Sequence, residues 1–306
     1  MAKLSRTVKE IIKTVLFFAV IALVLFVYVI YPLNSAKTLM ARADIDTYNP
    51  DSLAVNDPAA YQSAGLAADT FMFEADGLTN LACLKVPPGD DSLAEAQGTV
   101  FLLHKDGSDR DSLISLATAL HQAGFLVIAY DQRASGRTSG KYRGDGSHEA
   151  NDIQALISHL EIRGQIAHPL YLVGYELGAD AALLAADEEK RIDGVVAVTP
   201  YLTTPRFQDA LRARYEGYWF PFYRTIMWWW YEMRSSYATL YRRIEDIQAV
   251  SCPTLIFVPA DRTDSEEVLK ISELSPPEML QVAPVPADDS ALIDRIVSFV
   301  AALPTR

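Results

Sequence analysis

A glutamate stands at the turn that is best arranged in this chain to hold one reactive side chain. Residues 174–178, GYELG, follow the apolar run 170–173 and precede an alanine-rich stretch, which predicts a strand, a sharp turn and a helix. Glycines are needed at both ends because such a turn leaves no room for a Cβ atom. The turn would place one side chain at the centre of a reaction site. Glu176 therefore indicates either carboxylate chemistry or no chemistry.

The elements that must position this turn alternate along most of the chain. Short apolar runs predict strands at 99–103, 125–130, 170–174, 195–198, 254–258 and 280–285, preceded by two strands at 70–74 and 78–86. Helical spacing of apolar residues predicts helices that end near Gly124 and Gly164, and two more at about 175–186 and 290–303. This alternation indicates an α/β fold with a mostly parallel sheet and helices on both faces.

Several segments, in the right order, resemble the α/β-hydrolase superfamily, and most of all its membrane-anchored esterase-like and serine-aminopeptidase-like branches. The matching segments are the strand end and loop LLHKDG at 102–107, the loop DQRASGRTSG at 131–140, the acids Glu149 and Asp152, the turn at 174–178, and the strand that begins at 252–256. The resemblance covers about residues 67–303. It implies an α/β-hydrolase fold with a lid inserted at about 201–250.

The resemblance also assigns roles to single positions, and several of them hold unexpected residues. Glu176 occupies the position of the serine nucleophile, and Asp261 occupies the position of the acid. Asp288 or Asp289 falls where the catalytic histidine should be, and no histidine follows His168. Serine catalysis needs a hydroxyl group and a base that takes its proton. Both are absent from these positions.

The loop that would form the oxyanion hole is altered as well. The resemblance places His104, Lys105, Tyr175 and Leu177 around that hole, with Lys105 standing where the family has a glycine. We expect His104 to be structural, and Asp131 with its neighbour Arg133 to organise their loop by hydrogen bonds.

Three interpretations of the site follow. The favoured one is a hydrolase fold that has lost serine catalysis and serves in ligand binding or scaffolding. The alternative is a hydrolase of ester or amide bonds with a carboxylate-based site. The third is a rearranged serine or metal site, since Glu176, Asp261 and Asp289 would need a cation, a proton or a basic side chain such as Lys105 if they lay close together. We expect Lys105 as that partner, and neither a metal nor a cofactor.

The N-terminus has the composition of a membrane anchor. No charged residue occurs between Lys13 and Lys37, and this interval exceeds the ~20 apolar residues that cross a bilayer. A cleaved signal peptide would normally have an apolar region of only about 7–15 residues. We expect a cytoplasmic tail at 1–13, a single transmembrane helix at 14–34, a linker at 35–66 and an extracytoplasmic domain at 67–306, because basic residues concentrate before the span.

An aromatic and basic segment interrupts the alternation between about 201 and 250. All four tryptophans lie in it, and residues 206–243 carry seven arginines and three acids, a local charge of +4 in a chain of net charge −12. The segment is interpreted as a helical lid, either packed on the domain or resting on the membrane surface. The expected partners are therefore the bilayer and an acyl or lipid-like small molecule.

Two further features limit the function classes. The net charge of −12 argues against a nucleic-acid partner. Cys83 and Cys252 stand outside any zinc-ligand spacing, and a disulfide between them is left open.

Overall fold

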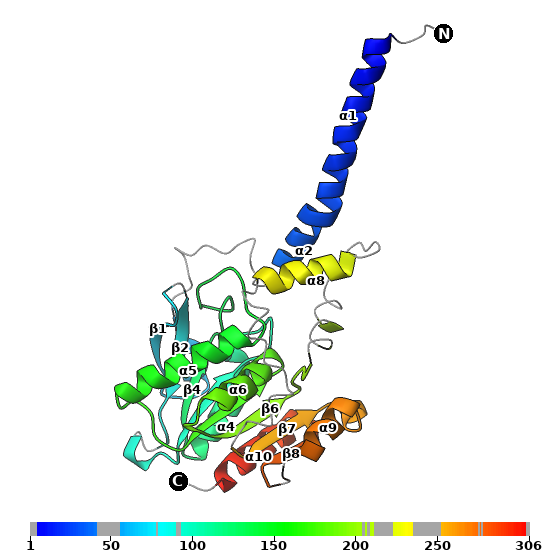
Figure 1. The fold of residues 1–306 in the computed structure, drawn as a ribbon. Helices are drawn as coiled ribbons and strands as arrows, with labels where there is room; N and C mark the ends of the chain where they lie inside the picture. The colour runs from blue at the N-terminus through cyan, green and yellow to red at the C-terminus, as the bar shows by residue number, and fades with distance from the viewer. Residues whose placement is uncertain are drawn as a thin grey trace. The chain divides into compact units, whose positions relative to one another are not determined.

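The computed structural model describes residues 5–41, 56–77, 79–89, 93–203, 206, 209–210, 223–234, 252–274, 276 and 278–303. Internal contacts divide the chain into two units (Figure 1). The smaller contains Met1–Met40 and Leu211–Thr239, and the larger contains Ala41–Ala210 and Leu240–Arg306.

An eight-stranded sheet forms the centre of the larger unit (Figure 1). Its strands are β1 (Asp69–Glu74), β2 (Asn80–Val86), β3 (Thr99–Leu103), β4 (Leu126–Tyr130), β5 (Leu170–Tyr175), β6 (Ile192–Val198), β7 (Thr254–Val258) and β8 (Leu280–Pro284). They are ordered β1-β2-β4-β3-β5-β6-β7-β8. The pairs β1–β2 and β2–β4 are antiparallel and the remaining pairs are parallel. The predicted α/β class with a mostly parallel sheet is therefore confirmed.

Helices cover both faces of this sheet. The helices of the larger unit are α3 (Ala59–Ser63), α4 (Ile114–Gln122), α5 (Ser147–Ile162), α6 (Leu177–Glu188), α9 (Glu266–Leu274) and α10 (Asp289–Ala302). Residues from α5, α6 and α9 share one core with the sheet, and residues from α3, α4 and α10 share the other. Side chains alternate between the two cores along a strand because successive residues point to opposite faces. In β3, for example, Phe101 and Leu103 belong to the first core, whereas Val100 and Leu102 belong to the second.

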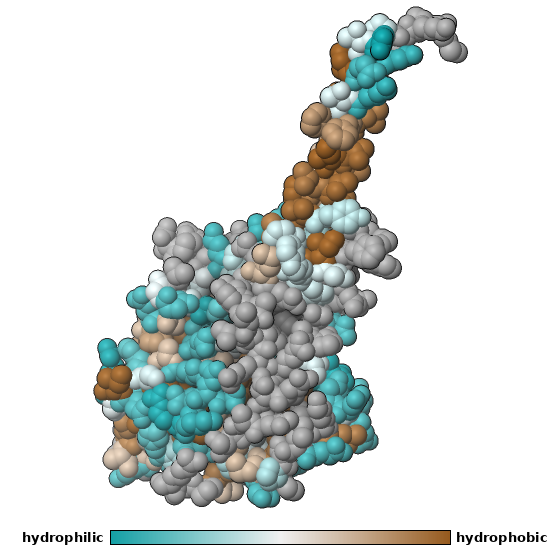
Figure 2. Space-filling model, in the orientation of Figure 1, coloured by the Kyte–Doolittle hydropathy of each residue, from teal (hydrophilic) through white to brown (hydrophobic). Residues whose placement is uncertain are grey.

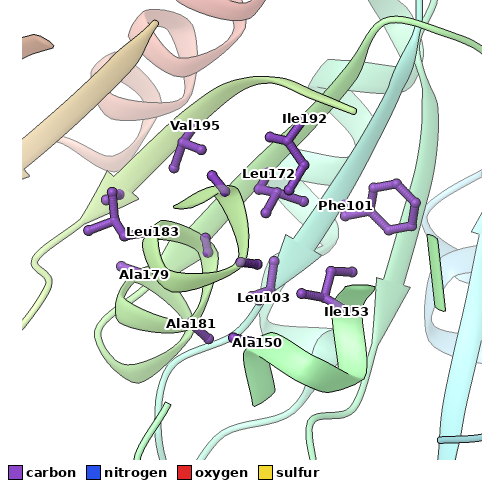
Figure 3. Close-up of a cluster of buried hydrophobic side chains, with 14 of the residues drawn as sticks. Phe101, Leu103, Ala150, Ile153, Leu172, Ala179, Ala181, Leu183, Ile192 and Val195 are labelled. Carbon is purple, nitrogen blue, oxygen red and sulfur yellow. The ribbon is translucent and has the colours of Figure 1, made fainter. Parts of the chain in front are cut away.

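The first core brings small residues of α6 against large residues of the strands. Figure 3 shows Ala179 and Ala181 of α6 and Ala150 of α5 facing strand residues such as Phe101 and Leu172. All five are buried. Alanines at these positions let the helices approach the sheet closely, which fixes the start of α6 against the strand ends that carry the candidate site.

Cys83 and Cys252 are both buried and both free, so the disulfide that the sequence left open is not formed.

The smaller unit contains a long N-terminal helix. It runs from Arg6 to Met40 as α1 (Arg6–Leu25), a π-helical stretch η1 (Phe26–Ile30) and α2 (Tyr31–Met40). Pro32 lacks an N–H group and its ring would clash with the preceding turn of a regular α-helix, which accounts for the π-helical stretch directly before it. No residue of its most apolar stretch is buried, and Figure 2 shows a mostly hydrophobic surface there. The helix is long and apolar enough to cross a membrane.

The helix α8 (Tyr223–Arg234) packs against α2 within the smaller unit. Met227 and Trp228 of α8 are buried, as are Ser35, Ala36 and Leu39 of α2. The sequence interpretation began the linker at residue 35, whereas the helix continues to Met40. Ser35 and Thr38 donate their hydroxyl hydrogens to the carbonyls of Tyr31 and Asn34, so polar side chains are accommodated there without ending the helix.

Part of the predicted linker and most of the predicted lid lie outside the described residues. These are residues 42–55 of the linker and residues 204–205, 207–208, 211–222 and 235–250 of the expected lid. The part of the lid that the structure describes consists of Tyr201–Thr203, Arg206, Asp209, Ala210 and α8. The interpretation of 201–250 as a lid therefore stays a prediction.

Candidate functional site

The turn between β5 and α6 has the strained geometry that its sequence predicts. Glu176 has φ 48° and ψ −112°, a conformation that side-chain-bearing residues rarely adopt. A Cβ atom on Gly174 would lie 2.1 Å from the carbonyl oxygen of Gly178. A Cβ atom on Gly178 would lie 2.6 Å from the carbonyl oxygens of Leu103 and His104. The two glycines thus allow α6 to begin directly against the end of β3.

A tyrosine hydroxyl holds the side chain of Glu176. The hydroxyl of Tyr201 donates a hydrogen bond to Glu176 Oε2 at 3.2 Å. The main chain of Glu176 is fixed as well, because its N–H donates to the carbonyl of Val198 at 2.9 Å and its carbonyl accepts from Asp180 at 3.1 Å. Glu176 is half-buried, so one acid is presented in a defined position and remains partly accessible to water.

Asp180, one helical turn after Glu176, anchors the segment that carries Tyr201. Its carboxylate accepts the backbone N–H groups of Tyr201 and Leu202, each at 3.3 Å. Leu202 has φ 68° and Thr199 has φ 50°, so this segment is strained on both sides of Tyr201. Burial raises the pKa of Asp180 to about 7, although the two N–H groups and the charge of Arg262 act in the opposite direction. A carboxyl group that titrates near neutral pH therefore lies beside the turn.

Arg262 joins the end of β7 to the same segment. It follows β7 in the short 3₁₀ helix η6 (Ala260–Arg262) and donates from Nη2 to the carbonyl of Tyr201 at 3.5 Å. Burial lowers the pKa of Arg262, and the nearby Arg206 lowers it further. Arg206 itself pairs with Glu267 of α9 through two hydrogen bonds of 3.2 Å. The residues after β6 and β7 are thus tied together by side chains around Tyr201.

The other two predicted acids lie at the ends of neighbouring strands. Asp261 is exposed in η6 after β7. Asp289 is the exposed first residue of α10 after β8, and its charge contributes to raising the pKa of Tyr175, for which burial is the larger cause. Asp289, at the position where the resemblance expects the histidine, is therefore close enough to the turn for its charge to act on Tyr175. Asp288 instead caps α10, since its side chain accepts from the N–H and hydroxyl of Ser290, which lowers its pKa.

The carboxylates do not form a metal-binding group in the part of the chain that the structure describes. No three His, Cys, Asp or Glu side chains there are arranged to hold an ion, and Glu176, Asp261 and Asp289 are all among the residues searched. The expected ion pair between Lys105 and Glu176 is not formed among the described side chains either, because Lys105 is exposed and Tyr201 occupies Glu176 Oε2.

His104 is committed to the structure through both ring nitrogens. Nδ1 bonds to the carbonyl of Lys105 at 2.7 Å, and Nε2 accepts the N–H of Gln132 at 2.9 Å. This pair of contacts fixes a neutral ring with its proton on Nδ1. Burial lowers the pKa of His104, which agrees with that assignment. The prediction of a structural His104 agrees with this geometry, and His104 cannot serve as a catalytic base without losing one of these bonds.

A second network of charges organises the loop after β4. Asp131 is fully buried and accepts the N–H groups of Arg110 and Arg137 at 2.8 and 2.9 Å. Arg133 binds both carboxylate oxygens of Asp152, one of them from Nε at 2.7 Å. Glu149 accepts the N–H groups of two glycines at 2.8 and 2.9 Å. The expected role of Asp131 and Arg133 as loop-organising residues agrees with these bonds.

Three residues of the site were not found from the sequence. These are Tyr201, Asp180 and Arg262. Tyr201 is hydrogen-bonded to Glu176, to Asp180 of α6 and to Arg262 after β7. Asp180 had a usable signal, because it lies four residues after Glu176 on the same predicted helix and so shares its face. Tyr201 and Arg262 had none, since only the fold brings residues 25 and 86 positions away to Glu176.

The chemistry open to this arrangement is narrow. Glu176 offers a carboxylate that accepts hydrogen bonds, Tyr201 offers a hydroxyl donor, and Asp180 offers a carboxyl group close to its titration midpoint at neutral pH. The position of the nucleophile holds no hydroxyl group, and His104 is engaged through both nitrogens.

Comparison with known proteins places this geometry in a family. Residues 94–251, half of the chain, match the family model described as serine aminopeptidase, S33. A thiohydrolase, apmlB, from Arthrinium phaeospermum is 35% identical over 89 residues, which make up 28% of this chain and 29% of that protein. The match thus spans less than a third of the curated relative.

Solved structures share the fold at low sequence identity. The esterase Pf2001 from Pyrococcus furiosus superposes with a TM-score of 0.61 at 18% identity, covering 81% of this chain and 96% of that one. The α/β hydrolase GrgF from Penicillium sp. sh18 has a TM-score of 0.57 at 16% identity, covering 77% and 98%. Together with the family match, the sheet order and the turn at Glu176, this shows that the chain belongs to the serine aminopeptidase S33 family of α/β hydrolases.

Proposed function

We propose that this chain is a membrane-anchored α/β-hydrolase-fold protein that has lost serine hydrolysis and binds an acyl or lipid-like ligand at the carboxyl ends of the strands. The observation that carries the proposal is the hydrogen-bonded carboxylate of Glu176 at the turn. A carboxylate held by Tyr201 stands where the reaction needs a hydroxyl group with a base beside it. The strained turn is retained although that reaction lacks its nucleophile, which supports a continued binding role.

The acids around the turn restrict the ligand. Glu176, Asp261 and Asp289 would repel the carboxylate of a free fatty acid, because like charges at short range raise the free energy of the complex. A neutral acyl ester or amide, or a ligand with a cationic headgroup, fits these acids better. Glu176 would supply an acceptor to such a headgroup, and the hydroxyl oxygen of Tyr201, whose hydrogen is donated to Glu176, would supply a second.

The anchor is the N-terminal helix. Its apolar, exposed surface supports a single pass through the bilayer (Figure 2). Lys3, Arg6, Lys9 and Lys13 precede the span, which supports a cytoplasmic N-terminus and an extracytoplasmic hydrolase-fold domain.

Loss of serine chemistry is tested with a fluorophosphonate probe, which forms a covalent adduct with an activated serine. The full chain in detergent is incubated with the probe beside an active serine esterase, and intact masses are measured. We expect no stoichiometric adduct on this chain and full labelling of the esterase. One adduct per chain would refute the proposal.

A carboxylate-based hydrolase is the second candidate, and the hydrogen bond between Tyr201 and Glu176 favours it specifically. Glu176 could attack the acyl carbon of an ester or amide and form a mixed anhydride, while the hydroxyl of Tyr201 gives its proton to the alcohol or amine that leaves. Water would then attack the anhydride at the Glu176 carbonyl, which releases the acid product and returns the carboxylate and the tyrosine proton. Turnover of an ester in heavy-oxygen water should leave the label in Glu176, and unlabelled Glu176 after many turnovers would exclude this route.

A further inference from the structure

The helix α8 presents an exposed stripe on the side away from its packing contacts. Thr225, Trp229 and Met233 are spaced four residues apart and therefore lie along one face. Trp229 is 52% exposed and Met233 is 56% exposed. Met227 and Trp228, on the other side, are buried in the smaller unit, where α8 packs against α2.

The aromatic residue of the stripe, Trp229, is held in place by its neighbour. The rings of Trp229 and Trp230 meet edge to face with centroids 4.8 Å apart, which fixes the position of the exposed indole. Trp229 and Met233 expose apolar surface to water, and removing that surface from water would lower the free energy. Tryptophan is enriched at the level of lipid headgroups because its ring is apolar while its N–H is polar.

The position of α2 along the N-terminal helix sets the level of α8. A helix rises about 1.5 Å per residue and the hydrocarbon layer is about 30 Å thick, so about 20 residues cross it. Counted from Thr14, the first residue after Lys13, the crossing ends near residue 33, inside the first turn of α2. The buried residues of α2, the helix against which α8 packs, are Pro32, Ser35, Ala36, Leu39 and Met40. Their place along the helix puts α8 at the level where hydrocarbon gives way to headgroups.

We propose that α8 is an interfacial helix whose stripe of Thr225, Trp229 and Met233 inserts into the lipid headgroup region of the bilayer that α1 crosses. The proposal rests on the proposed membrane anchor and goes beyond it, because it assigns a second membrane contact. The sequence of α8 itself holds two arginines and one acid, a net positive charge that anionic headgroups would attract. A bilayer therefore occupies the stripe and holds α8 at the membrane surface.

Depth-dependent quenching tests the proposal with the full chain in lipid nanodiscs. The two native cysteines are buried, so a fluorophore on a single introduced cysteine reports one position. The label is placed at Thr225→Cys on α8 or at Val20→Cys in the middle of α1. Spin-labelled lipids carry the quencher either near the headgroup or deep in the acyl chain, in anionic and in neutral bilayers.

We expect the α8 label to be quenched at least threefold more strongly by the shallow quencher than by the deep one, and the α1 label to show the reverse order. Trp229→Glu should reduce shallow quenching of the α8 label several-fold, whereas the matched change Trp229→Phe should retain most of it. Stronger quenching in anionic than in neutral bilayers would show that headgroup charge contributes.

The two labels separate the possible failures. A quenched α1 label with an unquenched α8 label would overturn the interfacial helix and leave the anchor intact. An unquenched α1 label would overturn the anchor and the interfacial helix together. Equal quenching of the α8 label in the Trp229→Glu and Trp229→Phe variants would show that the stripe does not make the contact.

Discussion

Two groups of charged residues in the larger unit differ in how they are satisfied. After β4, Asp131 and Glu149 are buried and each accepts two backbone N–H groups, and Asp152 binds Arg133 with both oxygens. At the ends of β5 to β8, the acids are more exposed and are held by a tyrosine hydroxyl, by backbone N–H groups or by a helix cap.

The difference separates the residues that hold the fold from the residues that surround the candidate site. Buried charges that lose their partners destabilise a protein by several kcal/mol, so the residues after β4 are needed whether or not a reaction takes place. The residues at the strand ends are partly exposed, and their types can change without unfolding the chain. A glutamate at the turn is therefore compatible with an intact α/β-hydrolase scaffold.

The largest effect is expected at the turn itself. Gly174→Ala would place a Cβ atom 2.1 Å from a backbone oxygen, and we expect a loss of at least about 3 kcal/mol in the free energy of unfolding, or failure to fold. Gly164→Ala is the contrasting control, because Gly164 has open space around it, and its positive φ of 62° should make the change cost only about 1 kcal/mol. Urea unfolding in detergent measures both. Equal losses would show that the turn is not tightly packed.

A similarly large effect is expected in the network after β4. Arg133→Met leaves the buried carboxylate of Asp152 without its charged partner, and we expect a loss of about 3–5 kcal/mol in the free energy of unfolding. The double variant Arg133→Met, Asp152→Asn removes that uncompensated charge and should recover much of the loss. A single variant as stable as the native chain would remove the contrast between the two regions.

A pH effect is expected at the strand ends. The pKa of Asp180 in the folded protein is about 7, above the value of about 3.9 in unfolded chains, so the folded state binds the proton more tightly. Its contribution to stability is complete below about pH 4 and is lost as the pH rises through about 7. Asp152, with a pKa raised by burial to about 6, acts in the same direction.

Between pH 4.5 and pH 7.5 these two carboxyl groups should therefore lower the free energy of unfolding, while His104, whose pKa is lowered by burial, acts in the opposite direction. Asp180→Asn should flatten the fall that the carboxyl groups cause. Asp294→Asn, at an exposed position of α10, is the matched change of charge and should leave the fall unaltered. Urea titrations at the two pH values decide between these outcomes. An unchanged slope in Asp180→Asn would show that this carboxyl group is not protonated more readily in the folded protein.

The smallest effect is expected at the hydrogen bond to Glu176. Tyr201→Phe removes the hydroxyl donor, but Glu176 is half-buried and water can replace it, so we expect a loss of about 1 kcal/mol or less in the free energy of unfolding. A loss as large as that of Arg133→Met would mean that the strand ends are as tightly constrained as the loop after β4.

The sequence predicted the scaffold well because local patterns determine it. The apolar runs placed every strand of the sheet to within a few residues, and the glycines around Glu176 predicted the turn. Helix α9 was missed, although Val268, Ile271 and Leu274 recur at helical spacing in its sequence. The end of the N-terminal helix was placed too early, since its stability after residue 34 comes from packing on α8, which lies far away in the sequence.

The site was predicted less completely than the fold. The resemblance identified Glu176, Asp261 and Asp289 by position, but no pattern indicates which residues surround a side chain in space. The expected partner Lys105 lies two residues beyond the end of β3 and is exposed, whereas Tyr201 comes from the segment after β6. Long-range contacts of this kind arise from the order of the strands in the sheet, which the sequence pattern alone did not determine.

The central claim is that Glu176 does not support hydrolysis, and turnover of a simple ester tests it most directly. Hydrolysis of a short-chain nitrophenyl ester is measured with the full native chain in detergent and with the variants Glu176→Ala and Glu176→Ser. We expect all three to match the rate in buffer, because the native chain and Glu176→Ala lack the nucleophilic hydroxyl and Glu176→Ser lacks a base for it. Native turnover at least tenfold above that of Glu176→Ala would contradict this and make Glu176 a catalytic residue.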